Sequence, residues 1–255
     1  MAGKHTTIAD ALVEDILSGH YRVGERLPSE RDLSSRFVVN RGAVREAMKQ
    51  LEQMGLACIQ PGGARVNAIQ QASLDVVGRL MSRGDLPDAQ LLDQILIVIS
   101  ALTAIAAEGA LNNGSEEDIG HIRKLVEPLT RSEINPDDHQ AARFALMEAI
   151  MLTSGNLICQ LIARTLFEQF EPSMEPLRPY AQNQLDIESY TTYARQLDSA
   201  LADRDIPKLR ATFEAFSNLN RKTVMQAFEA ARIEQTNGPA DSSNFSALKQ
   251  PQAAR

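Results

Sequence analysis

The stretch Leu27–Arg65 reads LPSERDLSSRFVVNRGAVREAMKQLEQMGLACIQPGGAR, and it decides the fold of the N-terminal part of the chain. Its pattern predicts a short helix over Ser29–Arg36, a tight turn at Phe37–Asn40 and a second amphipathic helix that opens at Arg41. Two helices joined by a tight turn are typical of a unit that puts its second helix into the DNA major groove. The N-terminal end of that helix then faces the bases.

A hairpin is predicted directly after the two helices. Leu56–Gln60 and Ala64–Ala68 are strand-like and are joined across a Pro-Gly-Gly turn. Upstream, apolar residues at helical spacing predict a first helix over Thr6–Ser18. Three helices and a two-stranded wing make a winged helix-turn-helix, which we place at residues 1–68.

The charge of the chain is unevenly distributed. The net charge is −7, but residues 1–70 hold nine Lys and Arg against eight Asp and Glu. Seven of those nine basic residues are Arg, the better side chain for reading guanine edges and holding phosphates. The basic surface is therefore local to the N-terminal part, and the acidic remainder indicates a second task for the rest of the chain.

The remainder of the chain is predicted to be almost entirely helical. Residues 69–75 form a short connector, and residues 76–234 show helical periodicity with no persistent strand-like alternation. We predict a mainly α protein with a C-terminal all-α domain of six or seven helices. Residues 235–255 are polar and rich in Gly, Pro and Ser, which predicts a disordered tail. Pro172–Pro179 is predicted to separate two helices.

Several classes of protein are excluded by the sequence. Cys58 and Cys159 lie far apart without a CxxC pattern, which indicates reduced thiols in a cytoplasmic protein. The most apolar run, Ile95–Ala107, is too short to span a bilayer, so no membrane partner is expected. The chain has no GxSxG, P-loop, Rossmann or HExxH pattern, so we do not expect an enzyme.

The N-terminal motif resembles the GntR family of bacterial regulators. The matching residues are Leu27-Pro28-Ser29-Glu30-Arg31-Asp32-Leu33, Asn40-Arg41-x-x-Val44-Arg45-Glu46-Ala47, Leu51-Glu52 and Gly55-Leu56. The C-terminal region resembles the FadR-type effector domain through Ser154-Gly155-Asn156 and Leu201-Ala202-x-x-Asp205. The resemblance implies a helical bundle around a ligand cavity, and homodimers that bind palindromic double-stranded operators.

The resemblance also implies which residues contact DNA. In the family, the arginines at the positions of Arg31, Arg41 and Arg45 contact guanines and backbone, and Asn40, Gly42 and Ala43 line the same surface. The wing is represented by Gly62, which permits close backbone approach, and by Arg65, which can hold a phosphate. The alternatives are that Glu30 and Glu46 pair with these arginines in a solvated network, and that the wing is a plain hairpin.

A metal centre common in this group is not expected. Many members hold a divalent metal through one Asp and three His, and those positions are here Arg143, Met147, Ala194 and Phe216. We therefore predict no metal and no cofactor. His139, beside two aspartates at a helix start, is expected to be exposed.

The residues at these four positions also indicate the chemical class of the effector. The early helix carries the apolar run Leu96–Leu102, and we assign effector binding to Ile99, Arg143, Met147, Ala194 and Phe216. An apolar cavity of this kind resembles the fatty-acid-responsive FadR group, whose bundle binds long-chain acyl-CoA, and burial of each CH₂ would add roughly 0.8 kcal/mol. Two alternatives stay open: a small carboxylate as effector, or a packed, ligand-free dimerisation body.

Overall fold

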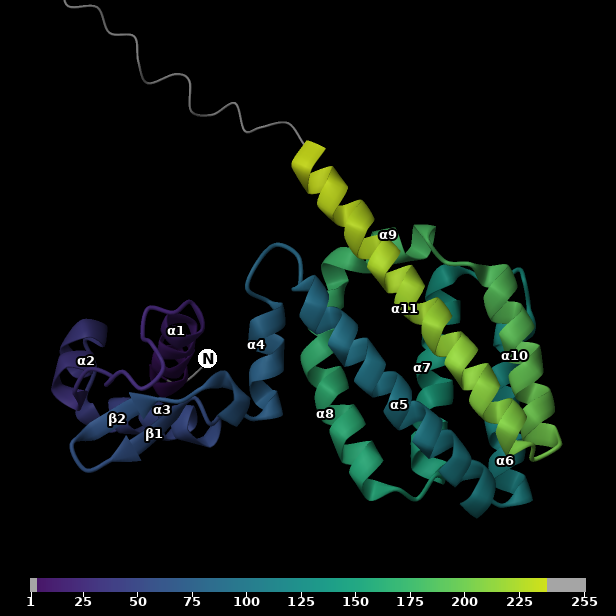
Figure 1. Cartoon of the computed structure of the whole chain (residues 1–255), viewed down its shortest axis with the longest axis horizontal. Coiled ribbons are helices and arrows are strands. Elements are labelled where there is room, and N and C mark those ends of the chain that lie inside the picture. The colour runs from purple at the N-terminus through teal and green to yellow at the C-terminus, as the bar shows by residue number, and fades with distance from the viewer. Residues whose placement is uncertain (1–3, 238–255) are drawn as a thin grey trace, which may run out of the picture. The chain divides into compact units, whose positions relative to one another are not determined.

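The computed structural model describes residues 4–237, and the part of the predicted tail from residue 238 onward lies outside this range (Figure 1). Backbone contacts divide the chain into two compact units. The first contains the residues up to Ala106 together with Gly155–Glu175, and the second contains Ala107–Ser154 and the residues from Pro176 onward. The predicted fold class is confirmed: a winged helix-turn-helix is followed by a helical C-terminal region. The domain boundaries proposed from the sequence stay a prediction.

The winged helix-turn-helix belongs to the first unit and has the predicted order of elements. Helices α1 (Lys4–Leu17), α2 (Glu30–Phe37) and α3 (Arg41–Gln53) are followed by strands β1 (Ala57–Gln60) and β2 (Gly63–Val66). The two strands are antiparallel, and their outermost pairs are Ala57 with Val66 and Gln60 with Gly63. The hairpin turn thus consists of the two residues Pro61 and Gly62.

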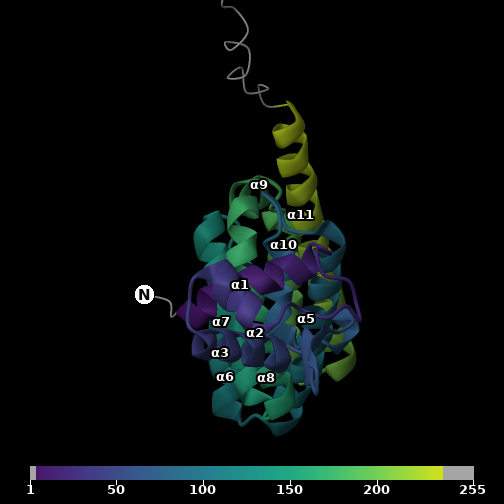
Figure 2. The same cartoon turned by 90° about the vertical axis from the view of Figure 1, so that its left-hand side faces the viewer.

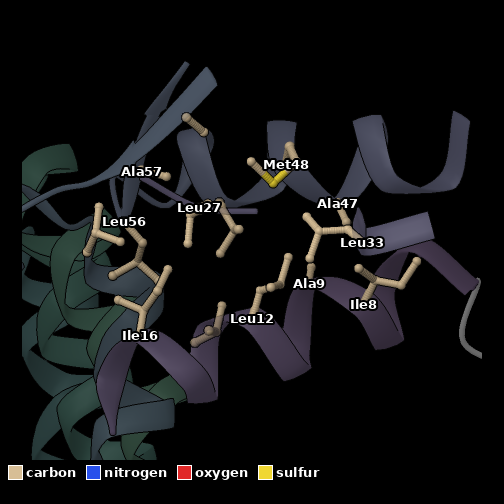
Figure 3. Packing of buried hydrophobic residues seen from close by; sticks show 14 of the residues in the cluster. Ile8, Ala9, Leu12, Ile16, Leu27, Leu33, Ala47, Met48, Leu56 and Ala57 are labelled. Carbon is tan, nitrogen blue, oxygen red and sulfur yellow. The ribbon is translucent and has the colours of Figure 1, made fainter. Parts of the chain in front are cut away.

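The core of this domain is formed by one face of α1 and the inner faces of the other elements. Ile8 and Leu12 are 2% and 0% exposed and point from α1 toward the side on which Leu33 and Ala47 lie (Figure 3). Leu33, Leu51 and Leu56 belong to the same cluster. Full burial of one such side chain contributes about 1.5–3 kcal/mol, so the apolar spacing read from the sequence fixes how the three helices meet.

Local interactions explain where α2 and α3 begin. The Ser29 hydroxyl accepts a hydrogen bond from the Asp32 amide at 3.3 Å and donates one to the Asp32 carboxylate at 2.6 Å. Between the helices, Val38 has φ 52° and ψ 51°, a left-handed conformation that is unusual for a β-branched residue. This residue turns the chain so that α3 can start three positions later.

The first unit continues beyond the wing. Two short 3₁₀ turns, Ile69–Gln71 and Leu74–Val76, lead into α4 (Val77–Met81), which packs against α8 (Leu157–Met174). An ion pair of 2.6 Å joins Arg79 of α4 to Asp10 of α1.

The second unit is an all-helical bundle. Its elements are α6 (Glu116–Val126), a 3₁₀ turn (Glu127–Thr130), α7 (Pro136–Thr153), α9 (Arg178–Asn183), α10 (Ile187–Ala202) and α11 (Ile206–Asn237). Helix α10 packs along α11 and against α6, and α6 also packs against α7. Figures 1 and 2 show these helices from two directions. Helix α5 (Ala89–Asn113) contributes its first part to the first unit and its last turns to the second.

Element boundaries in the winged domain differ from the sequence prediction by a few residues at most, and two boundaries of the C-terminal region need correction. The expected break at Pro172–Pro179 is wrong in detail, because α8 runs through Pro172 to Met174 and α9 starts at Arg178. Proline is tolerated in the first turn of a helix, which is where Pro179 stands in α9. Helix α11 also continues to Asn237, so residues 235–237 are helical and not part of a disordered tail.

The expectation that no segment is long enough to span a bilayer needs correction. Helix α5 has 25 residues and includes an 18-residue window of mean hydropathy 1.9, so by length and composition it can cross a membrane. The apolar run continues as a helix beyond the stretch judged from sequence. The core helix of a soluble protein passes the same test, so this finding is weak evidence for a membrane span.

Candidate nucleic-acid interface and effector site

The first turns of α3 carry the two arginines that the sequence singled out. Arg41 and Arg45 are one helical turn apart and both are exposed. Among the residues that the structure describes, no ion pair or side-chain hydrogen bond is found for Arg41. Its guanidinium is available to a ligand such as guanine O6 and N7.

Arg45 is held by a carboxylate from the preceding helix. Its Nε donates to both carboxylate oxygens of Glu30, each at 2.9 Å. The hydrogen bonds to Glu30 raise the pKa of the Arg45 guanidinium. Arg31 follows Glu30 on α2, is 78% exposed, and lies 3.8 Å from the Asp32 carboxylate. The pairing of Arg45 with Glu30, which the sequence left as an alternative, is present in this structure, whereas Glu46 pairs with Lys49.

Asn40, Gly42 and Ala43 build the N-terminus of α3. The Asn40 Oδ1 accepts a hydrogen bond from the Ala43 amide at 2.9 Å, which caps the helix. A Cβ on Gly42 would lie 3.2 Å from that oxygen, so the small residue keeps room for the cap. The remaining N–H groups of this terminus and the positive end of the helix dipole attract a phosphate.

Arg36 does not belong to this basic group. It stands only five residues before Arg41 in the sequence, but its Nη1 donates to the Asp15 carboxylate at 2.7 Å. The hydrogen bond to Asp15 raises the pKa of Arg36. The Arg36 Cζ also lies over the Phe37 ring, 4.8 Å from its centroid. Arg36 lies in the last turn of α2 and Asp15 lies in α1. Their ion pair therefore links α2 to α1.

The wing presents its backbone and two arginines. Gly62 has φ 102°, and a Cβ there would meet nothing within 4 Å, so the tip is open. Arg65 is exposed and donates from Nη1 to the Gly24 carbonyl at 2.8 Å. At Gly63 a Cβ would lie 2.6 Å from the Nε of Arg26, so the Arg26 side chain lies against the first residue of β2, next to the tip.

The second unit brings together several of the residues assigned to effector binding. Arg143 of α7 donates a hydrogen bond of 2.6 Å to Asn220 of α11, and its guanidinium lies 5.0 Å from the ring centroid of Tyr190 on α10. Phe216 of α11 lies 5.9 Å from the Tyr190 ring. Ala194, one turn beyond Tyr190, is fully buried. Arg143 and Phe216 therefore meet the same side chain of α10.

For Met147 and Ile99, no contact with the group around Tyr190 is described. Met147 is half-buried one turn beyond Arg143 on α7. Ile99 is 9% exposed on the part of α5 that belongs to the first unit. The participation of these two residues in an effector site stays a prediction.

The prediction for His139 was wrong. Its side chain is 1% exposed, and its ring contacts Tyr190 edge-on with centroids 4.8 Å apart. Burial, and secondarily the charge of Arg143, lower the pKa of His139 to about 4, so the imidazole is neutral at pH 7. The two preceding aspartates suggested an exposed helix start, but residue 139 is one turn before Arg143 and shares its inward face.

Three buried polar atoms in this unit were not found from the sequence. The Nε2 of His139, the hydroxyl of Tyr190 and the hydroxyl of Thr191 have no hydrogen-bond partner within the described residues. Such atoms are usually paired in native proteins, because burying them unpaired costs free energy. The i, i+4 spacing of His139 and Arg143 on α7 was the available signal.

The metal-ligand positions carry no ligand set. Within residues 4–237, no group of three or more His, Cys, Asp or Glu side chains is arranged to hold a metal ion. The absence of a metal requirement therefore stays a prediction.

Comparison with known proteins identifies the family. Residues 4–66 match the bacterial regulatory proteins of the gntR family. The matched N-terminal domain belongs to the GntR family, and its winged helix-turn-helix, with Arg41 open at the start of α3, indicates a DNA-binding transcriptional regulator.

Relatives with different names match the chain over most of its length. An uncharacterized HTH-type transcriptional regulator of Mycobacterium tuberculosis is 27% identical over 88% of both chains. The Uxu operon regulator of Haemophilus influenzae is 28% identical over 67% of this chain and 62% of its own length. The fatty acid metabolism regulator protein of Proteus mirabilis is 31% identical over 61% of this chain and 64% of its own length.

A solved structure has the same fold. The structure described under "Lar controls the expression of the Listeria monocytogenes agr system and mediates virulence" has a TM-score of 0.51 and 19% identity. It covers 90% of this chain and 98% of its own.

Proposed function

We propose that this regulator binds a palindromic operator as a homodimer in the cytoplasm, and that a small-molecule effector in the second unit changes its affinity for DNA. The observation that carries the effector is the buried group around Tyr190, where Arg143 and Phe216 meet unpaired polar atoms. A ligand that binds better to one arrangement of the two DNA-binding heads shifts the dimer toward that arrangement.

The first effector candidate is a long-chain acyl-CoA, with fatty-acid genes as targets. Relatives named fatty acid metabolism regulator proteins, at 30% and 31% identity, support it. So do the apolar residues at the positions where metal-binding members of the family have metal ligands. A third support is the group of aromatic rings formed by Tyr190, Tyr193 and Phe216. An acyl chain gains free energy for each CH₂ buried against such a group.

The second candidate is a small carboxylate, and Arg143 favours it. No acidic side chain pairs with this guanidinium among the described residues, and Asn220 takes only one of its five N–H donors. The His139 Nε2 and the Tyr190 hydroxyl are buried and unpaired in the same group. A carboxylate can accept a forked pair of hydrogen bonds from the guanidinium and one from the phenol.

The homodimer is supported by exposed apolar side chains on two helices of the first unit. They are Ile97, Val98 and Ile105 on α5, and Leu157, Ile158 and Leu161 on α8. A palindromic operator needs two copies of the DNA-binding head related by a two-fold axis. We assign these faces to contact with the second copy, and Ile158→Glu should increase the monomer fraction in analytical ultracentrifugation.

Fluorescence anisotropy of a labelled palindrome from the protein's own promoter tests the effector. Oleoyl-CoA should release the wild type, whereas Phe216→Arg should bind the operator normally and no longer respond. Release of Phe216→Arg by oleoyl-CoA would contradict the assigned pocket. A response to a small dicarboxylate alone, lost in Arg143→Gln, would select the second candidate, and no response to either class would leave a ligand-free dimerisation body.

A further inference from the structure

A third segment pairs with the two strands of the wing. The Leu27 amide donates to the Ala64 carbonyl at 2.9 Å, and the Val66 amide donates to the Glu25 carbonyl at 3.0 Å. Arg26 thereby forms an antiparallel bridge with Arg65 of β2. The segment just before α2 is thus fixed along the outer edge of β2.

This pairing places two arginines on one face of the wing. Directly opposed residues of an antiparallel pair share a face, and neighbours along a strand alternate between faces. Ala64 and Val66 are each 4% exposed on the core side, so Arg65 and its partner Arg26 lie on the solvent side. The Arg65 guanidinium donates to the Gly24 carbonyl, whereas no side-chain hydrogen bond is found for Arg26 among the described residues.

The guanidinium of Arg26 lies against the backbone at Gly63. A Cβ at that residue would stand 2.6 Å from Nε, 3.0 Å from Nη2 and 3.2 Å from Cζ of Arg26. The absence of a side chain at position 63 therefore lets the cation rest next to the turn Pro61–Gly62. The turn itself has no side chain that can donate a hydrogen bond.

No described residue neutralises this cation. Arg26 takes part in no ion pair or side-chain hydrogen bond found in residues 4–237, and the carboxylate of its neighbour Glu25 accepts the Arg22 amide at 2.9 Å. In contrast, Arg36 and Arg45 in the same domain are each bound to a carboxylate. Within residues 4–66, Arg22, Arg26 and Arg41 are thus the arginines available without breaking an internal side-chain contact, and Arg26 is the one that lies against the turn of the wing.

We propose that Arg26 binds a DNA phosphate beside the wing and supplies the charge that the tip turn lacks. The inference rests on DNA binding by this family and not on the effector. A guanidinium matches phosphate geometry with two parallel hydrogen bonds, and the open Gly62 backbone allows the duplex to approach. Because phosphate contacts carry no sequence information, Arg26 adds affinity and orientation but not base preference.

The test is a salt titration of operator binding and of binding to an unrelated duplex. Arg26→Ala should weaken both by the same factor and should reduce the slope of log K against log salt by about 0.9 for each protomer bound. Between 50 and 200 mM salt, the advantage of the wild type should fall about threefold per protomer. Arg26→Lys should keep the wild-type slope, because it keeps the charge.

Arg36→Gln is the matched control, since it removes one positive charge from the same domain at a side chain bound to Asp15. Its slope should equal that of the wild type. An unchanged slope and affinity for a folded Arg26→Ala would overturn the proposal, as would a loss confined to the operator, which would indicate base reading. Circular dichroism melts confirm folding, and wild-type binding to either duplex tests the DNA-binding class separately.

Discussion

Glu30 on α2 accepts two hydrogen bonds from the Nε of Arg45 on α3, each 2.9 Å long. The pair joins the two helices of the helix-turn-helix at the end that we expect to face DNA. In this structure, a carboxylate therefore occupies an arginine that we expect to contact DNA. On binding, Arg45 must share or exchange this partner for a base or a phosphate.

Glu30→Gln should therefore increase affinity for DNA of any sequence. The substitution removes a negative charge beside the phosphates and releases Arg45, so we expect binding to an unrelated duplex to improve several-fold at low salt. The ratio of operator to non-specific affinity should fall. Electrophoretic mobility shifts against both duplexes measure this, and weaker binding to both would indicate that Glu30 instead holds Arg45 in its binding conformation.

Arg41 is expected to make the larger base-specific contribution. Arg41→Ala should cost about 1–3 kcal/mol on the operator and relax the preference at the base pair it reads. Arg131→Ala is the control, because Arg131 is exposed in the second unit and its one ion pair among the described residues is with Glu127. Unchanged operator affinity in Arg41→Ala would refute the docking of α3 in the major groove.

The N-terminal fold was predictable because each of its elements carries its own signal. Ser29 and Asn40 are caps whose side chains accept from the backbone three residues on, and Gly55 stops α3 with φ 71°. The apolar spacing then orients the helices around one cluster. The segment that pairs with the outer edge of β2 was not predicted. Arg26 pairs with Arg65 there, but the sequence around Arg26 shows no strand periodicity.

The site in the second unit was less predictable because it depends on contacts between distant segments. Arg143 and Phe216 were found by their positions relative to family motifs, and the structure places both against Tyr190. Nothing near His139 in the sequence shows that α10 covers it. Sequence charge suggested exposure, and the packing of Tyr190 on the ring decides burial.

Gly55 is predicted to be the most demanding backbone position of the winged domain. A Cβ there would lie 2.2 Å from the Gln71 carbonyl oxygen, and the residue has φ 71°. Gly55→Ala should lower the free energy of unfolding by more than about 2 kcal/mol, through both the clash and the left-handed backbone. In thermal melts, the Tm of Gly55→Ala should lie well below that of Gly19→Ala. Gly19 also has a positive φ, 80°, but a Cβ there would meet nothing within 4 Å. Equal losses in the two variants would mean that the contact with Gln71 relaxes without cost.

Divalent metals are predicted to leave stability unchanged. Arg143, Met147, Ala194 and Phe216 occupy the positions where metal-binding relatives have Asp and His, and Zn²⁺ needs several N, O or S ligands that converge. Equimolar Zn²⁺ or Ni²⁺ should not raise the Tm, and EDTA should not lower it. A ligand that binds the folded state tightly would raise the Tm, so a clear increase would reveal a metal site.

His139 is predicted to make stability depend on pH. Its pKa of about 4 in the folded protein lies below the ordinary value of 6.5, because burial and then Arg143 disfavour the charged ring. The unfolded chain therefore binds the proton more readily, so the stability is fully present above pH 6.5 and is lost as the pH falls toward 4.

The difference is on the order of 3 kcal/mol between these limits. His139→Phe keeps a ring against Tyr190 and removes both the titration and the unpaired Nε2. Urea unfolding at pH 7 and at pH 4.5 should show a smaller loss of stability for His139→Phe than for the wild type. The carboxylates contribute equally to the acid sensitivity of both proteins, so their difference isolates residue 139. Parallel losses would mean that the His139 ring accepts a proton in the folded protein as readily as in the unfolded chain.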